Sequence, residues 1–552
     1  MATTRLVTPT KSAYDPPLII KRILEQSLKF EPDREIVYRD LIRMNYRDLN
    51  KRISQLANAL KSIGVKEGDV IGVLEFDSHR YLELYFAVPM IGAVLHTINY
   101  RLSPEQIAYT MNHAEDKVVF CHKTLLPLIT ALRPSLQTVE KYVVMKDDAD
   151  MPGDASFLSG EYETLLAGQS DEYDFPELGE HTMASLFYTT GTTGLPKGVC
   201  FSHRQLVLHT LGLVSSMSAI ESPVRIHSTD VYMPITPMFH VHAWGMPYVA
   251  TMLGMKQVYP GPYEPEMLMK LILGHRVSFS HCVPTILGML VNNPKVKALD
   301  LSFFRVIIGG SALPRGLAQA ALELGIDIIS GYGMSETCPV LTIAYLTKEM
   351  KEKMSKEEEV GERIKTGRPV LFVDLKLMDD EGKFLPFDGK TIGEIVVRAP
   401  WLTQTYYKEE ERSEDLWKYG YMHTGDMAYV EPGGTVVIVD RKKDVIKSGG
   451  EWISSLALES IISGLSGVKE TAVVGIPDPK WDERPLALVV LNEGAAVTAD
   501  DLKKHLQHFV NSGHLSKWAV PEEIRFVKEI PKTSVGKIDK KLIRKKIDSG
   551  EM

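Results

Sequence analysis

Short apolar runs alternate with amphipathic segments along the first two thirds of the chain. Mostly apolar runs of strand length occur at residues 70–76, 117–121, 185–190, 305–308 and 326–330, as is typical of buried strands. Ahead of the first run, residues 46–63 carry apolar side chains at helical spacing, namely Leu49, Ile53, Leu56, Leu60 and Ile63. Asn45, with Asp48 three residues later, is expected to cap this helix. The alternation predicts an α/β fold with largely parallel sheets.

The pattern changes after about residue 365, where turn-forming groups interrupt short strand-like runs. They lie at residues 367–369, 379–382 and 431–434 and indicate a small β-rich subdomain over residues 366–439. Residues 445–552 have the pattern of a compact α+β unit, with strands expected at 471–475 and 486–491 and a helix from Asp500. We therefore expect an N-terminal domain over residues 1–439, a hinge at residues 440–444 and a C-terminal domain over residues 445–552.

Composition narrows the class of protein. A chain of 552 residues is too long to fold around a single compact core, so more than one domain is expected. Its charged fraction of 24% and net charge of −8 are ordinary for a globular protein. Because acids and bases are interspersed, no nucleic acid is expected as a partner. We interpret the basic run at residues 540–546 as a solvated helix face, and the charged stretch at residues 348–359 as helical and facing solvent.

Cysteine usage and the N-terminal sequence bear on the compartment. The four cysteines lie far apart and form no C-x-x-C pair, which disfavours a disulfide framework and a thiolate metal site; they are Cys121, Cys200, Cys282 and Cys338. The N-terminus has no apolar signal region, and no run approaches the roughly 18 apolar residues of a membrane span. We expect a cytoplasmic protein without a transmembrane segment.

The densest chemical signal is a loop between an expected strand and a helix that begins near His203. It contains Thr189, Thr190, Gly191, Thr192, Thr193, Gly194 and Lys197. Glycines and small hydroxyl residues let a backbone wrap closely around phosphate oxygens, and the lysine adds a positive charge. Lys197 is followed by Gly198 rather than by a hydroxyl residue, so the loop is not a Walker sequence. We interpret it as a phosphate-binding loop of another kind.

This loop resembles the signature of the adenylate-forming superfamily, which includes acyl-CoA synthetases, beetle luciferases and the adenylation domains of peptide synthetases. Seven further motifs follow in the order of that superfamily, at residues 237–240, 309–314, 331–337, 421–426, 440–444, 446–453 and 531–537. The resemblance implies two α/β subdomains with parallel sheets, a small β-barrel-like subdomain and a mobile C-terminal domain. It also implies a reaction in which ATP activates a carboxylic acid as acyl-AMP and the acyl group passes to coenzyme A.

The same resemblance implies roles for single residues around the nucleotide. Glu336 is expected to bind Mg²⁺ with the hydroxyl of Thr189, because Mg²⁺ takes few protein ligands and completes its shell with phosphate and water. Asp426 is suited to bind both ribose hydroxyls, and Tyr332 to stack on adenine. Further nucleotide contacts are expected from Gly310, Ser330, Gly331, Ser335, Arg441, Lys443, Lys447 and Trp452.

The C-terminal motifs imply a moving part. In the superfamily the lysine that matches Lys537 enters with the small domain and bridges carboxylate and phosphate. Together with Glu336 and Lys197 around the phosphates, Lys537 is an expected catalytic residue. The domain then rotates about the hinge, here Asp440, and brings a loop to the site for thioester formation. The matching residues here are Gly449, Gly450 and Glu451.

The segment with His240, Val241 and Trp244 indicates which class of carboxylic acid is the substrate. The superfamily places this motif between nucleotide and acyl pocket, and the segment most resembles medium- and long-chain fatty-acyl-CoA synthetases, in which the Trp gates an acyl tunnel. His240 and Trp244 would otherwise be core residues on one helical face. The expected pocket segments, residues 245–248 and 283–290, hold no Lys or Arg and suit an aliphatic or unsubstituted aromatic acid. A homodimer is expected by analogy with the fatty-acyl enzymes.

Other readings stay open at this stage. A short-chain or benzoate-like acid is the main alternative substrate. A peptide-synthetase domain is disfavoured because residues 231–246 contain no acidic residue and no carrier domain is expected after Lys537. Luciferase-type oxidation shares the adenylation motifs. A non-catalytic nucleotide-binding regulator would not need Lys197, Glu336, Asp426 and Lys537 together.

Overall fold

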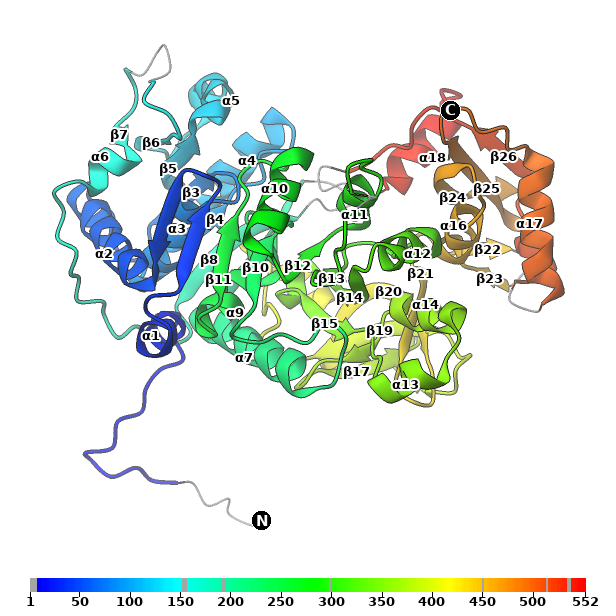
Figure 1. Ribbon diagram of the computed structural model, residues 1–552, viewed down its shortest axis with the longest axis horizontal. Coiled ribbons are helices and arrows are strands. Elements are labelled where there is room, and N and C mark those ends of the chain that lie inside the picture. Colours follow the sequence, from blue (N-terminus) through cyan, green and yellow to red (C-terminus); the bar gives the residue numbers. More distant parts are fainter. Residues whose placement is uncertain are drawn as a thin grey trace.

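The computed structural model describes residues 7–150, 156–189, 195–296, 299–448, 451–512, 515–533 and 538–552. These residues form four sheets. Three sheets build a broad body, and the fourth belongs to a smaller C-terminal part that lies beside it, in orange and red in Figure 1. No helix among the described residues is long and apolar enough to cross a membrane.

The first sheet has seven strands in the order β7-β6-β5-β3-β4-β8-β9. Neighbouring strands are parallel except β8 and β9, which run antiparallel on either side of the expected phosphate loop. The strands are β3 (Val70–Leu74), β4 (Val94–Thr97), β5 (Asp116–His122), β6 (Lys141–Met145), β7 (Gly160–Glu161), β8 (Met183–Thr189) and β9 (Lys197–Ser202). The associated helices are α2 (Tyr46–Ser62), α3 (His79–Met90), α4 (Pro104–Ala114), α5 (Leu126–Leu132) and α6 (Tyr162–Leu166).

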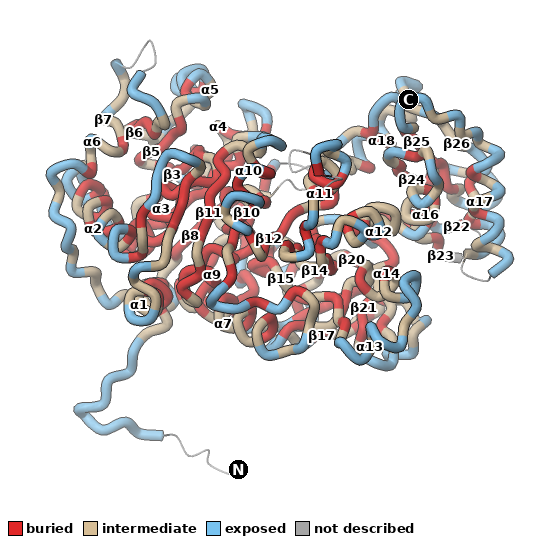
Figure 2. The backbone as a smooth tube through the Cα atoms, in the orientation of Figure 1, coloured by how far each residue is buried: buried red, intermediate tan, exposed pale blue. Residues whose placement is uncertain are grey.

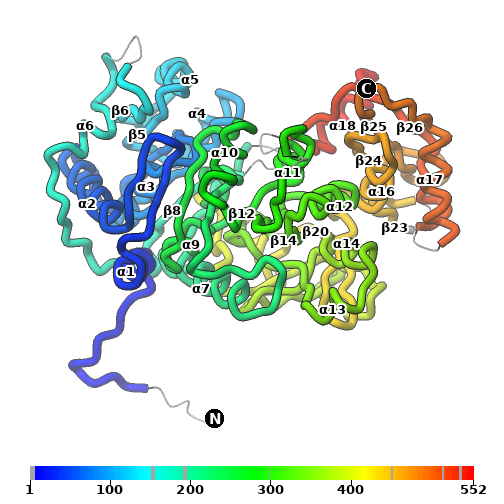
Figure 3. Tube along the Cα trace, viewed as in Figure 1, coloured from blue at the N-terminus to red at the C-terminus, as the bar shows by residue number. Residues whose placement is uncertain are grey.

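The second sheet has nine strands in the order β16-β15-β14-β13-β12-β10-β11-β1-β2, and its central strands are parallel. They are β1 (Glu35–Tyr38), β2 (Ile42–Asn45), β10 (Val231–Pro234), β11 (Lys256–Tyr259), β12 (Phe279–Cys282), β13 (Arg305–Ile308), β14 (Asp327–Gly333), β15 (Val340–Ile343) and β16 (Arg368–Pro369). Strand β1 pairs with β11 despite their distance in sequence, as the blue and green traces of Figure 3 show.

Helices surround the second sheet, whose strands are mostly buried, like those of the first (Figure 2). These helices are α1 (Lys21–Phe30), α7 (His203–Ala219), α9 (Met246–Met252), α10 (Pro265–His275), α11 (Pro284–Val291), α12 (Arg315–Glu323), α13 (Lys348–Lys353) and α14 (Lys356–Ile364). The predicted α/β architecture is therefore confirmed. It arises because apolar strands cannot face water and each sheet must be covered by helices.

The remaining sheets follow in sequence. A five-stranded antiparallel sheet comprises β17 (Asp374–Met378), β18 (Phe384–Leu385), β19 (Gly393–Arg398), β20 (Met422–Val430) and β21 (Val436–Arg441), with helix α15 (Glu410–Leu416) inserted. The C-terminal sheet comprises β22 (Ile446–Ser448), β23 (Glu451–Ile453), β24 (Val468–Asp478), β25 (Asp482–Leu491) and β26 (Glu523–Phe526). Helices α16 (Ser455–Ser463), α17 (Ala499–Asn511) and α18 (Lys540–Asp548) complete it.

Local sequence signals explain several of these elements. The predicted helix at residues 46–63 is α2, and its expected cap is present: the Asn45 side chain accepts from the backbone N–H of Asp48, whose carboxylate accepts from the Asn45 N–H. The predicted charged helix at residues 348–359 is split into α13 and α14, because Ser355 caps a new helix. Residues 348–359 are exposed or partly exposed throughout, so the prediction that this stretch faces solvent is confirmed. The buried residues of α14, Val360 and Arg363, follow it.

The prediction that residues 540–546 form a solvated face is wrong for part of α18. The helix exists, but Lys540 and Ile543 are buried in it. The ammonium of Lys540 lies 2.9 Å from the Glu459 carboxylate of α16, and Arg544 lies 2.7 Å from Asp444. Basic residues of this helix can pack against the rest of the protein because acidic side chains on other elements compensate their charge. The local sequence does not reveal these partners.

Candidate active site

A cleft of about 1820 Å³ opens between the body and the C-terminal part. Many of the residues singled out in the sequence line it, although they come from different sheets and connecting segments. They are Thr189, Lys197, His240, Val241, Trp244, Gly310, Ser330, Gly331, Tyr332, Ser335, Glu336, Asp426, Asp440, Arg441 and Lys443. Several converge on the carboxyl end of the second sheet, where parallel sheets commonly bind ligands.

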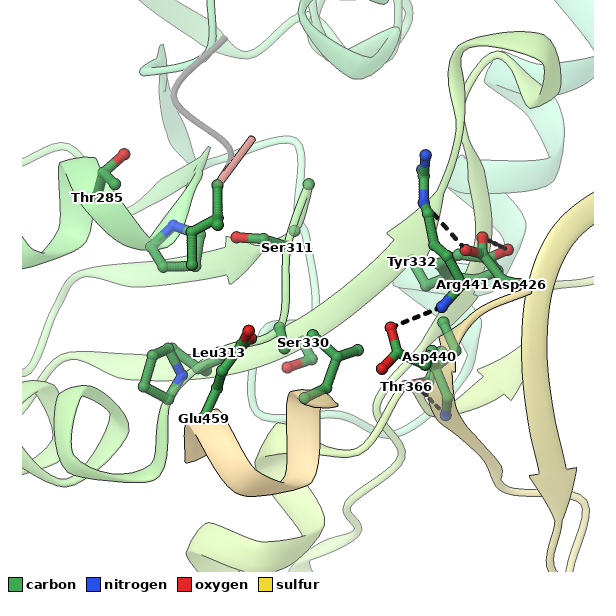
Figure 4. A pocket seen from close by; sticks show the side chains of 18 of the residues that line it. Thr285, Ser311, Leu313, Ser330, Tyr332, Thr366, Asp426, Asp440, Arg441 and Glu459 are labelled. Carbon is green, nitrogen blue, oxygen red and sulfur yellow. Dashed lines mark hydrogen bonds and ion pairs between the residues drawn. The ribbon is translucent and has the colours of Figure 1, made fainter. Parts of the chain in front are cut away.

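One side of the cleft carries a hydrogen-bonded group from β14, β20 and β21. The phenol of Tyr332 donates to Oδ2 of Asp426 at 2.7 Å, and Nε of Arg441 lies 3.3 Å from Oδ1. Asp426 and Arg441 face each other across the paired strands β20 and β21, and Figure 4 shows all three side chains together. Burial, followed by the negative charge of Asp426, raises the pKa of Tyr332, so its hydroxyl stays protonated and donates.

A second group surrounds Glu336, which follows β14. Its carboxylate Oε1 accepts a hydrogen bond of 2.8 Å from the phenol of Tyr406, and its backbone oxygen accepts one of 2.9 Å from the N–H of Thr403. The ammonium of Lys197 lies 4.5 Å from the centre of the Tyr406 ring. Thr189, at the end of β8, lines the same cleft.

The oxygen atoms of Glu336 and Thr189 fit a Mg²⁺ ion that is bound together with a nucleotide. Glu336 offers a buried carboxylate at the cleft wall and Thr189 a hydroxyl. Among the described residues no group of three or more His, Cys, Asp or Glu side chains could hold a metal ion alone. Mg²⁺ needs no such cage, since phosphate oxygens and water complete its shell.

The wall with His240 and Trp244 has an unusual backbone. Val241, His242, Ala243 and Trp244 have φ angles of 48°, 53°, 47° and 59°, and Gly245 continues at 72°, so the turn is left-handed. Each such non-glycine residue costs roughly 1–2 kcal/mol, and strain of this kind is concentrated at functional sites. The interpretation of His240 and Trp244 as one face of an ordinary helix is therefore wrong.

The left-handed turn sets where two aromatic side chains lie. The indole of Trp244 packs on the ring of His281, with centroids 5.0 Å apart, and a Cβ on Gly309 would lie 2.9 Å from it. Gly309 is thus required for the indole to reach this position. His242 is buried beside Phe187 at 5.4 Å, and burial lowers its pKa to about 3, so it is neutral.

The C-terminal part closes the other side of the cleft through α16 and the segment before α18. The carboxylate of Asp440 accepts from the backbone N–H groups of Arg441 and Ser455, each at 2.8 Å, and from the Ser455 hydroxyl. Thr533 and Ile538 line the cleft and flank the segment that holds Lys537. Asp440 therefore lies where the last strand of the body meets the first helix of the C-terminal part.

Some residues singled out in the sequence are not brought to the cleft. Lys447 and Trp452 are paired across the β22–β23 hairpin, with the ammonium 5.2 Å from the Trp452 ring. The ring is 42% exposed, and neither residue is among those that line the cleft. Thr190, Gly191, Thr192, Thr193, Gly194, Gly449, Gly450, Lys537 and the side chain of Glu451 lie outside the described part of the structure.

Two residues of the site escaped the sequence analysis. Tyr406 contacts both Glu336 and Lys197, yet it lies in a run of aromatic and charged residues without glycine, which gives no local signal. Glu394 of β19 accepts a hydrogen bond of 3.0 Å from the N–H of Gly425 and so holds the turn before Asp426. Only the pairing of β19 with β20 reveals it.

Comparison with known proteins agrees with this geometry. The model of the AMP-binding enzyme family matches residues 24–407, and that of the AMP-binding enzyme C-terminal domain matches residues 457–537. The long-chain-fatty-acid–CoA ligase of Thermus thermophilus is 42% identical over 528 residues, which cover 94% of each chain. The 3-methylmercaptopropionyl-CoA ligase of Ruegeria lacuscaerulensis is 38% identical over 96% of this chain and 97% of its own.

A solved structure is similar over nearly the whole chain. The anthranilate CoA ligase AuaEII in complex with anthranoyl-AMP has a TM-score of 0.85 at 25% identity and covers 97% of this chain and 98% of its own. The resemblance therefore extends from the large body through the C-terminal part. With the family models matched and relatives this similar over almost their full length, the chain belongs to the AMP-binding enzyme family.

Proposed function

We propose that this protein is an AMP-forming acyl-CoA synthetase that acts on a medium- or long-chain fatty acid. The observation that carries the proposal is the shared cleft, in which Asp426, Glu336 and Lys197 meet the wall formed by Trp244. A nucleotide, its metal ion and an apolar acid would all reach one another there. The relatives named as CoA ligases support the same reading.

In the first half-reaction a carboxylate oxygen of the acid attacks the α-phosphorus of ATP, and the bond to pyrophosphate breaks. Asp426, held by Tyr332, binds the ribose hydroxyls, and Glu336 with Thr189 would hold Mg²⁺. When bound, Mg²⁺ supplies positive charge to the phosphates. Lys197 adds a further positive charge, and because two anions must meet, positioning and neutralisation account for most of the rate.

Lys537 would complete this step, and its neighbours Thr533 and Ile538 already face the cleft. For the second half-reaction, residues 445–552 would rotate as a domain against residues 1–439 about Asp440. Gly449, Gly450 and Glu451 would then replace Lys537 at the site, where the CoA thiolate attacks the acyl carbon and AMP leaves. Lys447 and Trp452, which do not line the cleft in this structure, would reach the site in that second orientation.

The acid would lie against Trp244, Ile307, Val340 and the start of α11, all of which line the cleft. This wall suits an aliphatic chain. A second candidate, a short-chain or aryl acid, is favoured by the similarity to enzymes named for 3-methylmercaptopropionate and anthranilate. We also propose a cytoplasmic homodimer, which size-exclusion chromatography with light scattering would distinguish from a monomer.

The test is pyrophosphate release over saturated acids from C2 to C18, plus benzoate and anthranilate, with and without CoA. The proposal expects turnover that depends on the acid and on CoA and is greatest for acids of medium or long chain. A preference for C2–C4 or aryl acids would show that the substrate is a short-chain or aryl acid rather than a medium- or long-chain fatty acid. Absence of CoA-stimulated turnover with every acid would contradict the proposed activity.

A further inference from the structure

Tyr406 contacts two residues of opposite charge through different parts of one ring. Its hydroxyl donates to the Glu336 carboxylate at 2.8 Å, and its face lies 4.5 Å from the Lys197 ammonium. Among the described residues no ion pair joins Lys197 to Glu336. The ring therefore contacts a cation and an anion that would otherwise attract each other in a partly dry cleft.

The backbone around Tyr406 leaves little freedom for the ring. Tyr406 forms a backbone bridge with Val199 of β9, the strand that begins with Lys197. Its N–H donates to the Ser413 hydroxyl of α15 at 2.9 Å, and the next N–H, from Tyr407, donates to the Gly198 oxygen at 2.8 Å. The side chain is only 5% exposed. The ring is thus fixed relative to the lysine strand on one side and to a helix on the other.

The hydroxyl of Tyr406 is the donor in this contact, because the Glu336 carboxylate oxygen can only accept. A ring that only filled space would need no hydroxyl, and Phe would serve. The hydrogen bond occupies Oε1 of Glu336 and thereby fixes the orientation of the whole carboxylate.

We propose that Tyr406 is a positioning residue that keeps Glu336 and Lys197 apart, so that the carboxylate is held for Mg²⁺ and the ammonium for nucleotide phosphates. This inference rests on the proposed function, because it takes a Mg²⁺-bound nucleotide as the ligand. The hydroxyl serves the metal side through Glu336, and the ring face serves the phosphate side through Lys197. Substitutions of Tyr406 can separate the two effects.

The experiment is calorimetric binding of a non-hydrolysable ATP analogue, with Mg²⁺ titrated and with EDTA. Tyr406→Phe keeps the ring and removes the hydroxyl. It should raise the Mg²⁺ concentration for half-maximal nucleotide binding about 10-fold, as for one lost hydrogen bond to a charged group. Nucleotide affinity in EDTA should stay within about twofold, since the cation–π contact remains.

Tyr406→Leu removes both contacts and should also weaken nucleotide binding in EDTA several-fold, because Lys197 can then approach Glu336. Tyr407→Phe is the matched control: its ring contacts His113 at 5.8 Å instead of the charged pair, and binding should not change. In a Glu336→Gln background, Tyr406→Phe should have no further effect on the Mg²⁺ requirement. If the Leu variant does not fold, the Phe variant and this double variant decide.

An unchanged Mg²⁺ requirement in Tyr406→Phe would overturn the inference, as would an equal loss of affinity with Mg²⁺ and with EDTA. A shift of equal size in Tyr407→Phe would also overturn it. Failure of the proposed function is distinguishable: the wild-type protein would then lack acid-dependent pyrophosphate release, whereas the binding results on Tyr406 would remain as measured.

Discussion

The phenol of Tyr332 donates a 2.7 Å hydrogen bond to the carboxylate of Asp426. Tyr332 lies where β14 of the second sheet pairs antiparallel with β15, whereas Asp426 lies in the five-stranded sheet that follows. The bond therefore joins two subdomains at the point where the nucleotide is proposed to bind. It fixes the carboxylate from one side and places the aromatic ring beside the cleft.

Tyr332→Phe should raise the KM for ATP about 10-fold or more, because a hydrogen bond to a charged group is lost. The ring remains for stacking, so the KM for the acid should change less than twofold. Steady-state kinetics with each substrate varied would measure both. Tyr429→Phe, on the same strand as Asp426 but outside the cleft lining, is the control. An unaltered KM for ATP would show that Tyr332 does not support Asp426.

Trp244→Ala should alter acid selection more than nucleotide binding. The indole occupies the cleft wall against His281 and Gly309, and its removal opens volume there. We expect kcat/KM for long or bulky acids to rise relative to that for short acids by about 10-fold, the scale of one to two methylene groups in a pocket. Competition between C6 and C16 acids would measure the ratio. A constant ratio would place the acid elsewhere.

Lys540→Met should destabilise the C-terminal part by about 3–5 kcal/mol, since removal of one partner leaves a buried charge uncompensated. Glu459, at 2.9 Å, is that partner. Urea unfolding would report the loss, with exposed Lys545→Met as the control on the same helix. Equal stability of both variants would mean that the buried pair contributes nothing.

Asp77 should make stability depend on pH. Burial raises the pKa of Asp77 to about 7, against an ordinary value of 3.8. The folded protein thus holds this proton more tightly, so the associated stability is complete below pH 3.8 and is lost as the pH rises through about 7. Asp77→Asn should avoid this loss, which is on the order of 2–4 kcal/mol.

Denaturant unfolding at pH 5 and pH 8 would test this, with exposed Asp171→Asn as the control. The wild-type protein should lose stability relative to Asp77→Asn over that interval. Parallel profiles for wild type and Asp77→Asn would show that the carboxylate is charged throughout. Asp77 also accepts a hydrogen bond of 2.8 Å from the N–H of Met238. A change in the charge of Asp77 would therefore also affect the segment before His240.

Local sequence signals predicted the α/β fold because they report local physics. Asn45 and Asp48 cap α2 as expected, and the run at residues 305–308 is the buried strand β13. The burial of Lys540 could not be predicted in this way, because its partner Glu459 lies 81 positions away and on another helix. The expected solvated face ignored a partner that only the tertiary fold supplies.

The residues of the site likewise differ in whether the local sequence could predict them. Glu336 and Asp426 stand in glycine-containing motifs that the sequence displays, and the fold brings both to one cleft. Tyr406 has no such motif, and its contact with Glu336 spans 70 positions. The left-handed turn at Val241 was also unforeseen, because a β-branched residue gives no hint of a positive φ. Such strain is stable only where the surrounding packing imposes it.

Acid-dependent exchange of labelled pyrophosphate into ATP, without CoA, is the decisive measurement because it reports the adenylation step alone. We expect exchange in the wild-type protein with a medium- or long-chain fatty acid. We expect near-complete loss in Lys537→Ala, whereas that variant still forms thioester from supplied acyl-AMP and CoA. Wild-type binding of ATP without exchange for any acid would contradict the proposed adenylation, and equal loss of both half-reactions in Lys537→Ala would contradict the role of that lysine.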